Sequence, residues 1–225
     1  MLFRTAASIN EIVALQRTLV AVGELAPADG KLVPFQLVEG AMTLLLQLTE
    51  AEKAAKGAKS LEKVEVEGAA NARDAAVASL LAVGPELNAQ YASQRCVVGA
   101  YLRLARGSAA VMKVQPETLV SPVLTVFFDA MQSTDRSVEP YESTRAIDAQ
   151  QIFVKWLQKE GGADLTAKLC FEQAFQAVLG LFQAQPTKEL AEAVGLMIST
   201  DAAHVVHLEQ VLIPVLQQLE QAIAS

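Results

Sequence analysis

Residues 164–186 read DLTAKLCFEQAFQAVLGLFQAQP. The apolar side chains in this stretch recur at intervals of three and four residues, which is the spacing of one face of an α-helix. Asp164 is suited to cap such a helix, and Pro186 would end it. The pattern predicts a helix with a broad apolar face at the centre of a core. That face comprises Leu165, Leu169, Phe171, Phe175, Val178, Leu179 and Phe182.

The rest of the chain is divided into similar periodic segments by glycine, proline and capping residues. Val64 and Val66 alternate with glutamates and leave a short extended piece open as an alternative, although the alanine-rich residues that follow favour helix. We therefore predict an all-α protein, a multi-helix bundle of about eight or nine helices. The expected helices are 8–23, 32–56, 60–83, 84–107, one from Pro116 or Pro122 through Met131, one after Ser143 that ends at Gly161, 164–185, one from Thr187 through Met197, and one capped by residues 199–201 that runs nearly to Ser225.

The stretch 107–115 reads as a connector, which divides the sequence into two parts. We expect residues 1–108 to form an N-terminal half of the bundle and residues 109–225 a C-terminal half, packed together or merged into a single domain. Residues 133–143 are the most loop-like stretch, because they combine turn-forming residues with no apolar stripe.

Composition supports the helical prediction and limits the possible partners. The chain has 225 residues, of which 52% are hydrophobic and only 5% aromatic, a balance that favours close-packed helices over a β-sandwich. The 18 basic residues are outnumbered by 25 acidic ones, so the net charge of −7 would repel a phosphate backbone. The sequence therefore predicts an acidic protein that does not bind nucleic acid.

Three features favour a soluble, cytoplasmic protein. Cys96 and Cys170 lie far apart in the sequence and form no zinc or thiol redox motif. The opening residues run directly into a capping box at Ser8, with no signal peptide before it. The longest uncharged stretch, 173–187, is shorter than the ~20 apolar residues that a membrane-spanning helix needs.

Both histidines lie in one short run, which makes Asp201, His204 and His207 the candidate metal ligands. Their spacing of three places them near one another on a helix. A di-metal helical bundle, however, needs histidine-bearing motifs on two helices, and this sequence has only one such segment. The simpler interpretation places His204 on the apolar stripe with Leu208 and Leu219, and His207 at the solvent edge. We therefore expect no metal and no cofactor.

No residue combination predicts catalysis. Ser199, Asp201 and His204 resemble a hydrolase triad in composition, but adjacent residues of one helix start do not form a relay with an oxyanion hole, and Ser199 and Asp201 are more simply helix caps. Glu39 and Glu172 sit among apolar neighbours, where exposure on the polar side of a helix is the commoner outcome. Phosphate loops and nucleophile elbows are missing from the sequence, so we expect no catalytic residues and favour a non-enzyme.

Residues 59–60 and 71–74, which read Lys-Ser and Asn-Ala-Arg-Asp, resemble an uncharacterised family of all-helical bacterial proteins. That family carries Asp-x-x-Arg-Asp after a serine-capped turn, and Ala70 stands here in place of the first aspartate. The resemblance covers the first half of the chain. It implies a bacterial, all-helical protein and no particular activity.

The large apolar content and the positive mean hydropathy predict helix faces that are covered by other helices or by another subunit. We therefore expect a non-enzymatic helical interaction or scaffold protein, which forms a homo-oligomer or binds a protein partner. The alternative is a helical bundle that binds an apolar small molecule or a metal. The residues expected near such a ligand are Phe171, Phe175, Phe182, Met197 and His204.

Overall fold

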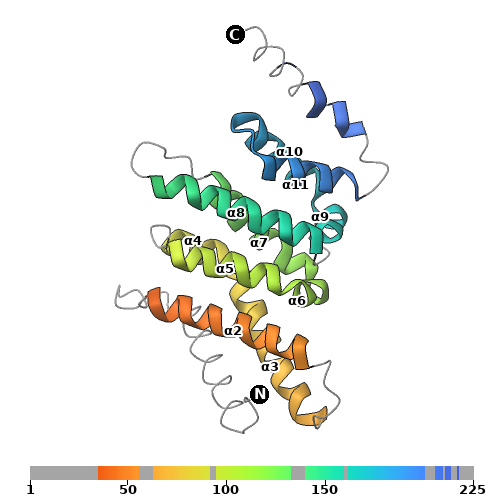
Figure 1. Cartoon of the computed structure of the whole chain (residues 1–225). Coiled ribbons are helices and arrows are strands. Elements are labelled where there is room, and N and C mark those ends of the chain that lie inside the picture. Colours follow the sequence, from red (N-terminus) through yellow and green to blue (C-terminus); the bar gives the residue numbers. More distant parts are fainter. Residues whose placement is uncertain are drawn as a thin grey trace. The chain divides into compact units, whose positions relative to one another are not determined.

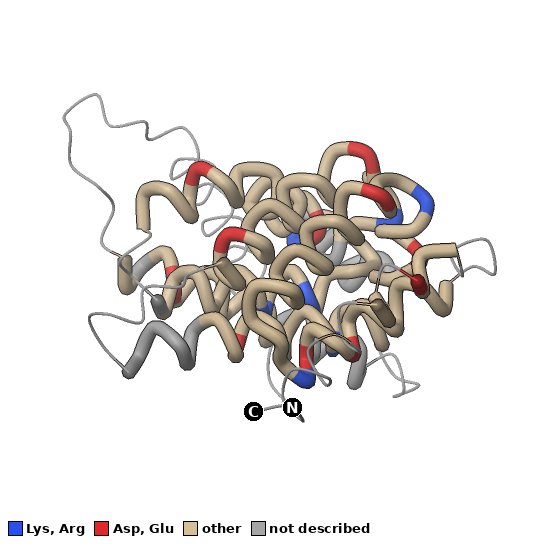
Figure 2. Tube along the Cα trace, turned by 90° about the horizontal axis from the view of Figure 1, so that it is seen from above, with Lys and Arg blue, Asp and Glu red and all other residues tan. Residues whose placement is uncertain are grey.

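The computed structural model describes residues 35–55, 63–91, 95–132, 140–159, 162–200, 206–209, 211–213 and 217. Every regular element within these ranges is a helix, and none of the described residues forms a strand (Figure 1). The predicted all-α multi-helix fold is therefore confirmed. The helix expected at 8–23 lies outside the described residues. Charged positions are dispersed along a mostly uncharged tube (Figure 2).

The chain divides into two compact units, Met1–Val126 (unit 1) and Phe127–Ser225 (unit 2). The division falls inside helix α7 (Pro116–Gln132), which begins at the first of the two prolines considered as its start. The stretch 107–115, expected to be a connector, instead contains helix α6 (Ala109–Val114). The prediction of two domains that meet at residue 108 stays a prediction.

Unit 1 is built around the packing of α2 (Phe35–Ala55) along α5 (Arg95–Gly107). Val38, Met42 and Leu45 are buried on one side of α2. A Cβ atom at Gly107 would lie 2.6 Å from the Leu46 Cδ1 atom, so the glycine allows α2 to approach the end of α5 closely. Two further helices of this unit are α3 (Lys63–Ala82), which includes the alternating valines, and α4 (Gly84–Gln90).

Tyr101 connects α5 to the turn between α3 and α4. Its buried hydroxyl donates a hydrogen bond to the Leu81 carbonyl oxygen at 2.9 Å. Its ring lies where a side chain on Gly84 would have to be, so that position accepts only glycine in this packing. The tyrosine thus fixes where α5 crosses the end of α3.

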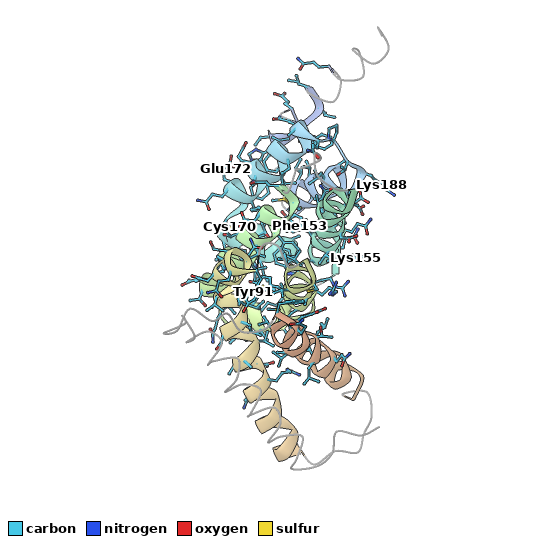
Figure 3. The ribbon with its side chains drawn as sticks, turned by 90° about the vertical axis from the view of Figure 1, so that its left-hand side faces the viewer. Tyr91, Phe153, Lys155, Cys170, Glu172 and Lys188 are labelled. Atoms are coloured by element: carbon cyan, nitrogen blue, oxygen red, sulfur yellow. The ribbon has the colours of Figure 1, made fainter. Side chains whose placement is uncertain are left out.

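In the described part of unit 2, four helices follow the end of α7, and the core of this unit is aromatic. The Phe127 and Phe153 ring centroids are 5.2 Å apart, and Trp156 stacks on both at 5.9 Å. In Figure 3, Phe153 points into the packed side chains of this unit, whereas Lys155 on the same helix points away. The helices are α8 (Pro140–Lys159), α9 (Gly162–Leu169), α10 (Phe171–Ala184) and α11 (Lys188–Ile198), and α11 packs on both α8 and α10.

Thr187 joins local structure to tertiary packing at the start of α11. Its hydroxyl oxygen accepts a hydrogen bond from the Leu190 backbone N–H at 3.2 Å, so Thr187 is the N-cap of α11, the helix expected to start at this residue. The same hydroxyl donates to the Oε1 atom of the buried Gln150 on α8, at 2.7 Å. One side chain therefore caps α11 and satisfies a buried polar group of the neighbouring helix.

Two predictions of continuous helices are wrong. The helix expected at 84–107 is interrupted at Tyr91 (φ −113°, ψ 28°), and the helix expected at 164–185 is interrupted at Cys170 (φ −154°, ψ 33°). Neither residue is a glycine or proline, so no local breaker marks these positions. Burial of the Tyr91 side chain shows that tertiary packing accompanies the first interruption.

Three smaller expectations also differ from the structure. Asp164 lies within the first turn of α9 instead of capping it, where its charge suits the helix dipole. Residues 140–143, expected to belong to a loop, are helical, because α8 begins at Pro140, whose fixed φ suits a first helical turn. Residues 133–139 of the expected loop lie outside the described residues. Leu169, expected on the apolar face at the centre of the core, is exposed.

The turn from α8 into α9 depends on a glycine. A Cβ atom at Gly162 would lie 2.5 Å from Cδ2 and 2.7 Å from Cε2 of Trp156, and 2.7 Å from the Trp156 carbonyl oxygen. Trp156 is completely buried, so neither its ring nor its backbone has room to move. Gly162 therefore permits a close contact that any larger residue would break.

We predict that Gly162→Ala lowers the free energy of unfolding by about 1–3 kcal/mol, because the added methyl group overpacks the indole. The matched control is Gly180→Ala in α10, since a Cβ atom there meets nothing within 4 Å. That substitution should be neutral or stabilising by up to about 1 kcal/mol. Urea unfolding of both variants measures the difference, and equal effects would contradict the packing described at Trp156.

Candidate functional site

The residues predicted from the sequence as metal ligands are only partly described. Asp201 and His204 lie outside the described residues. His207 is described, in a segment whose residues 206–209 and 211–213 form helical turns. We call residues 206–213 the C-terminal segment.

His207 anchors the C-terminal segment to α10. Its ring centroid lies 4.8 Å from that of Phe175 and 5.4 Å from that of Phe171. Its Nε2 atom is 3.7 Å from the Oε2 atom of Glu172, an ion pair when the imidazole is protonated. The side chain is 15% exposed, so His207 lies between the aromatic rings of α10 and the solvent. The two phenylalanines cover it because α10 presents both on one face.

The C-terminal segment is otherwise strongly apolar and exposed. Glu209 is the only charged residue in its sequence. With His207 on α10, the neighbouring side chains point outward instead of into the unit 2 core. The exposed apolar side chains are Val206 (73%), Leu208, Leu212 (51%) and Ile213 (54%). Exposed clusters of this kind mark interaction sites in soluble proteins.

Two hydroxyl groups that precede the C-terminal segment donate hydrogen bonds to the end of α11. Ser199 Oγ donates to the Leu196 carbonyl oxygen at 2.8 Å, and Thr200 Oγ1 donates to the Met197 carbonyl oxygen at 2.7 Å. Both carbonyl groups belong to the last turn of α11. Backbone carbonyl oxygens in the last turn of a helix have no backbone N–H donor within that helix. Ser199 is therefore the C-cap of α11. The start of the helix that residues 199–201 are expected to cap lies outside the described residues, so that expectation stays a prediction.

A metal centre gains no support from the described part of the chain. No group of three His, Cys, Asp or Glu side chains within it is placed to hold a metal ion. Because Asp201 and His204 are not among the described residues, the expectation of no metal at these two positions stays a prediction.

Glu39 and Glu172, singled out for their apolar neighbours, have different environments. Glu172 is exposed, as expected, and its carboxylate lies beside the His207 imidazole. Figure 3 labels Glu172 on α10. Glu39 on α2 is half-buried and accepts a hydrogen bond from the Cys96 thiol of α5. Sequence reasoning did not connect Glu39 with Cys96, because their contact comes from the packing of two helices.

Both cysteines are free thiols that resist ionisation. Burial raises the pKa of Cys96, and the hydrogen bond to Glu39 and its negative charge raise it further. Burial also raises the pKa of Cys170. A thiolate is the nucleophilic form of cysteine, so these environments disfavour nucleophilic chemistry.

The residues proposed to surround an apolar ligand are parts of the helical core. Phe175, Phe182 and Met197 are buried where α10 packs on α11. Phe171 is half-buried and contacts Phe175 and His207. His204, the fifth residue of this set, lies outside the described residues.

No protein-family model, curated protein or solved structure matches this chain. No helix in the described ranges has the length and apolar character needed to cross a membrane.

We predict that His207→Ala loosens the C-terminal segment, because the loss of its contacts with two aromatic rings removes about 0.5–1.5 kcal/mol of local stability. Hydrogen exchange of residues 206–213 should accelerate, while exchange in α11 stays the same. Glu209→Ala, at an exposed position of the same segment, is the control and should have little effect. Identical exchange in the wild type and His207→Ala would show that the imidazole is not the anchor.

We also predict that the protein loses stability as the pH rises. Burial raises the pKa values of Tyr91 and Tyr101, as it does those of the two cysteines. The folded state therefore retains protons that the unfolded state releases, and stability is complete only below the ordinary pKa values. The urea midpoint should fall between about pH 8 and about pH 11, with a shallower fall above about pH 10 in Tyr101→Phe. A midpoint that is constant or rises over this interval would contradict the described burial.

Proposed function

We propose that this chain is a non-enzymatic helical interaction protein that self-associates through its C-terminal segment. The exposed apolar cluster is the observation that supports this proposal. Eight large apolar side chains are exposed among the described residues, and four of them belong to residues 206–213. Large apolar side chains scattered singly need no explanation, but four within one short helical segment favour a binding surface.

The anchor on α10 makes the segment part of the folded surface. His207 contacts Phe171 and Phe175 from the side opposite to solvent, so the segment keeps a defined position on unit 2. A helical segment that is held in place loses less conformational entropy on binding than a free tail. This arrangement favours a specific partner helix over non-specific adhesion.

A second copy of the chain is the partner that we propose. An apolar helical segment can pair with its own copy about a twofold axis, the commonest symmetry of soluble oligomers. Glu209 is the only charge in the segment, so little like-charge repulsion opposes the pairing. Binding to a helix of a different protein, in the manner of an adaptor, uses the same surface and is the alternative form of the proposal.

We also propose that the protein is cytoplasmic, and this part of the proposal and its non-enzymatic part both rest on the two cysteines. Cys96 and Cys170 are free thiols with raised pKa values, which suits a reducing compartment and not a nucleophilic role. A bacterial source follows only from the resemblance at residues 59–60 and 71–74. Binding of a metal or an apolar small molecule is the other hypothesis, and no contact among the described residues favours it.

We predict that Leu212→Glu weakens self-association at least tenfold, or by about 1.4 kcal/mol or more, because it places a charge in an apolar interface. Val114→Glu is the matched control: Val114 is 78% exposed but stands apart from the C-terminal segment in sequence and belongs to unit 1. Sedimentation velocity over a range of protein concentrations measures both variants and the wild type.

The expected result is an oligomer in the wild type and Val114→Glu and a lower assembly state in Leu212→Glu. A wild type that stays monomeric at every concentration would contradict self-association. An oligomer that Leu212→Glu leaves intact would place the interface elsewhere.

A further inference from the structure

Glu209 lies on the side of the C-terminal segment that is turned away from α10. His207 and Val211 are the half-buried residues of this segment, and the His207 ring packs on Phe175 of α10. Residues two positions apart on a helix point in nearly opposite directions, so Glu209 faces away from both of them. Its side chain is exposed, and no hydrogen bond or ion pair joins it to another described residue.

The described neighbours of Glu209 on the helix surface are apolar. Residues three and four positions apart adjoin one another on a helix. For Glu209 these neighbours are the most exposed large apolar side chains of the segment, namely Val206 (73% exposed), Leu212 (51%) and Ile213 (54%). A carboxylate therefore stands in the middle of the surface through which we propose that the chain self-associates.

A second copy of the segment has no basic side chain to offer this carboxylate. In a twofold pair the same patch lies on both sides of the contact. Lys188 is the last lysine or arginine of the sequence, so residues 189–225 contain neither. The imidazole of His207 lies against Phe171 and Phe175 of its own chain. Pairing through the apolar cluster thus brings two carboxylates into an apolar contact without a positive charge beside them.

The carboxylate of Glu209 opposes such a contact because it must lose water. Removal of a carboxylate from water is unfavourable unless a positive charge or hydrogen-bond donors take the place of the water. In a single chain Glu209 is exposed, so this cost arises only when two copies meet. A charge placed within an exposed apolar surface is a common means of limiting association. We propose that Glu209 limits the strength of self-association and so keeps the assembly reversible, an inference that rests on the proposed function.

Sedimentation velocity of the full-length protein over a range of concentrations tests this proposal. Glu209→Gln keeps the size of the side chain and removes its charge, so the association constant should rise about three- to tenfold. Glu117→Gln is the matched control, because Glu117 is an exposed residue of α7 in unit 1 and its substitution changes the net charge by the same amount. The control should associate like the wild type.

An unchanged association constant in Glu209→Gln would overturn the proposal, as would an equal rise in Glu117→Gln. Weaker association of Glu209→Gln would overturn it too, because Glu209 would then pair with a basic residue elsewhere in the other copy. If Leu212→Glu dissociates the wild-type oligomer, each of these results rejects only the role of Glu209 and leaves the proposed interface in place. A monomer in both the wild type and Glu209→Gln would reject the interface as well.

Discussion

The contact between Gly162 and the indole of Trp156 determines the path of the chain through unit 2. Trp156 is buried among Phe127 and Phe153, and its ring and carbonyl oxygen leave no room for a side chain on Gly162. α9 must therefore begin directly over the end of α8. From there the interruption at Cys170 leads into α10, and α10 carries the two phenylalanines that receive His207. The close contact at Gly162 thus lies at the start of the path that leads to the two phenylalanines beneath the exposed apolar segment.

Features that depend on neighbouring residues in the sequence could be predicted. The three- and four-residue spacing of apolar side chains predicts the helical fold, and it also predicts a helix that starts at Thr187. The structure agrees, because the Thr187 hydroxyl accepts a hydrogen bond from the backbone N–H three residues later. The second partner of that hydroxyl, Gln150, could not be predicted, since it comes from a different helix. The helix interruptions at Tyr91 and Cys170 could not be predicted either. Both residues continue an apolar pattern without a glycine or proline, so only tertiary packing distinguishes them from helix interiors.

The environment of His207 could be predicted only in part. Helical spacing places His207 at the edge of the apolar stripe, but it does not show which helix the ring contacts. The structure closes α11 with Ser199 and Thr200, and the C-terminal segment then approaches α10 with the His207 ring turned inward. Phe171 and Phe175 form the pair of rings that His207 contacts. The sequence places both phenylalanines on an apolar face but does not show which side chain of another segment packs on them.

The described residues combine a well-packed interior with thiols that resist ionisation and with an apolar segment directed outward. These features support binding between helices as the role of the chain, with a second copy as the proposed partner. Native mass spectrometry of protein purified from its own source tests this account most directly, because it reports the assembly state and any retained ligand together. The account predicts an oligomer that carries no other molecule. A monomer that retains a stoichiometric metal ion or apolar small molecule would contradict it.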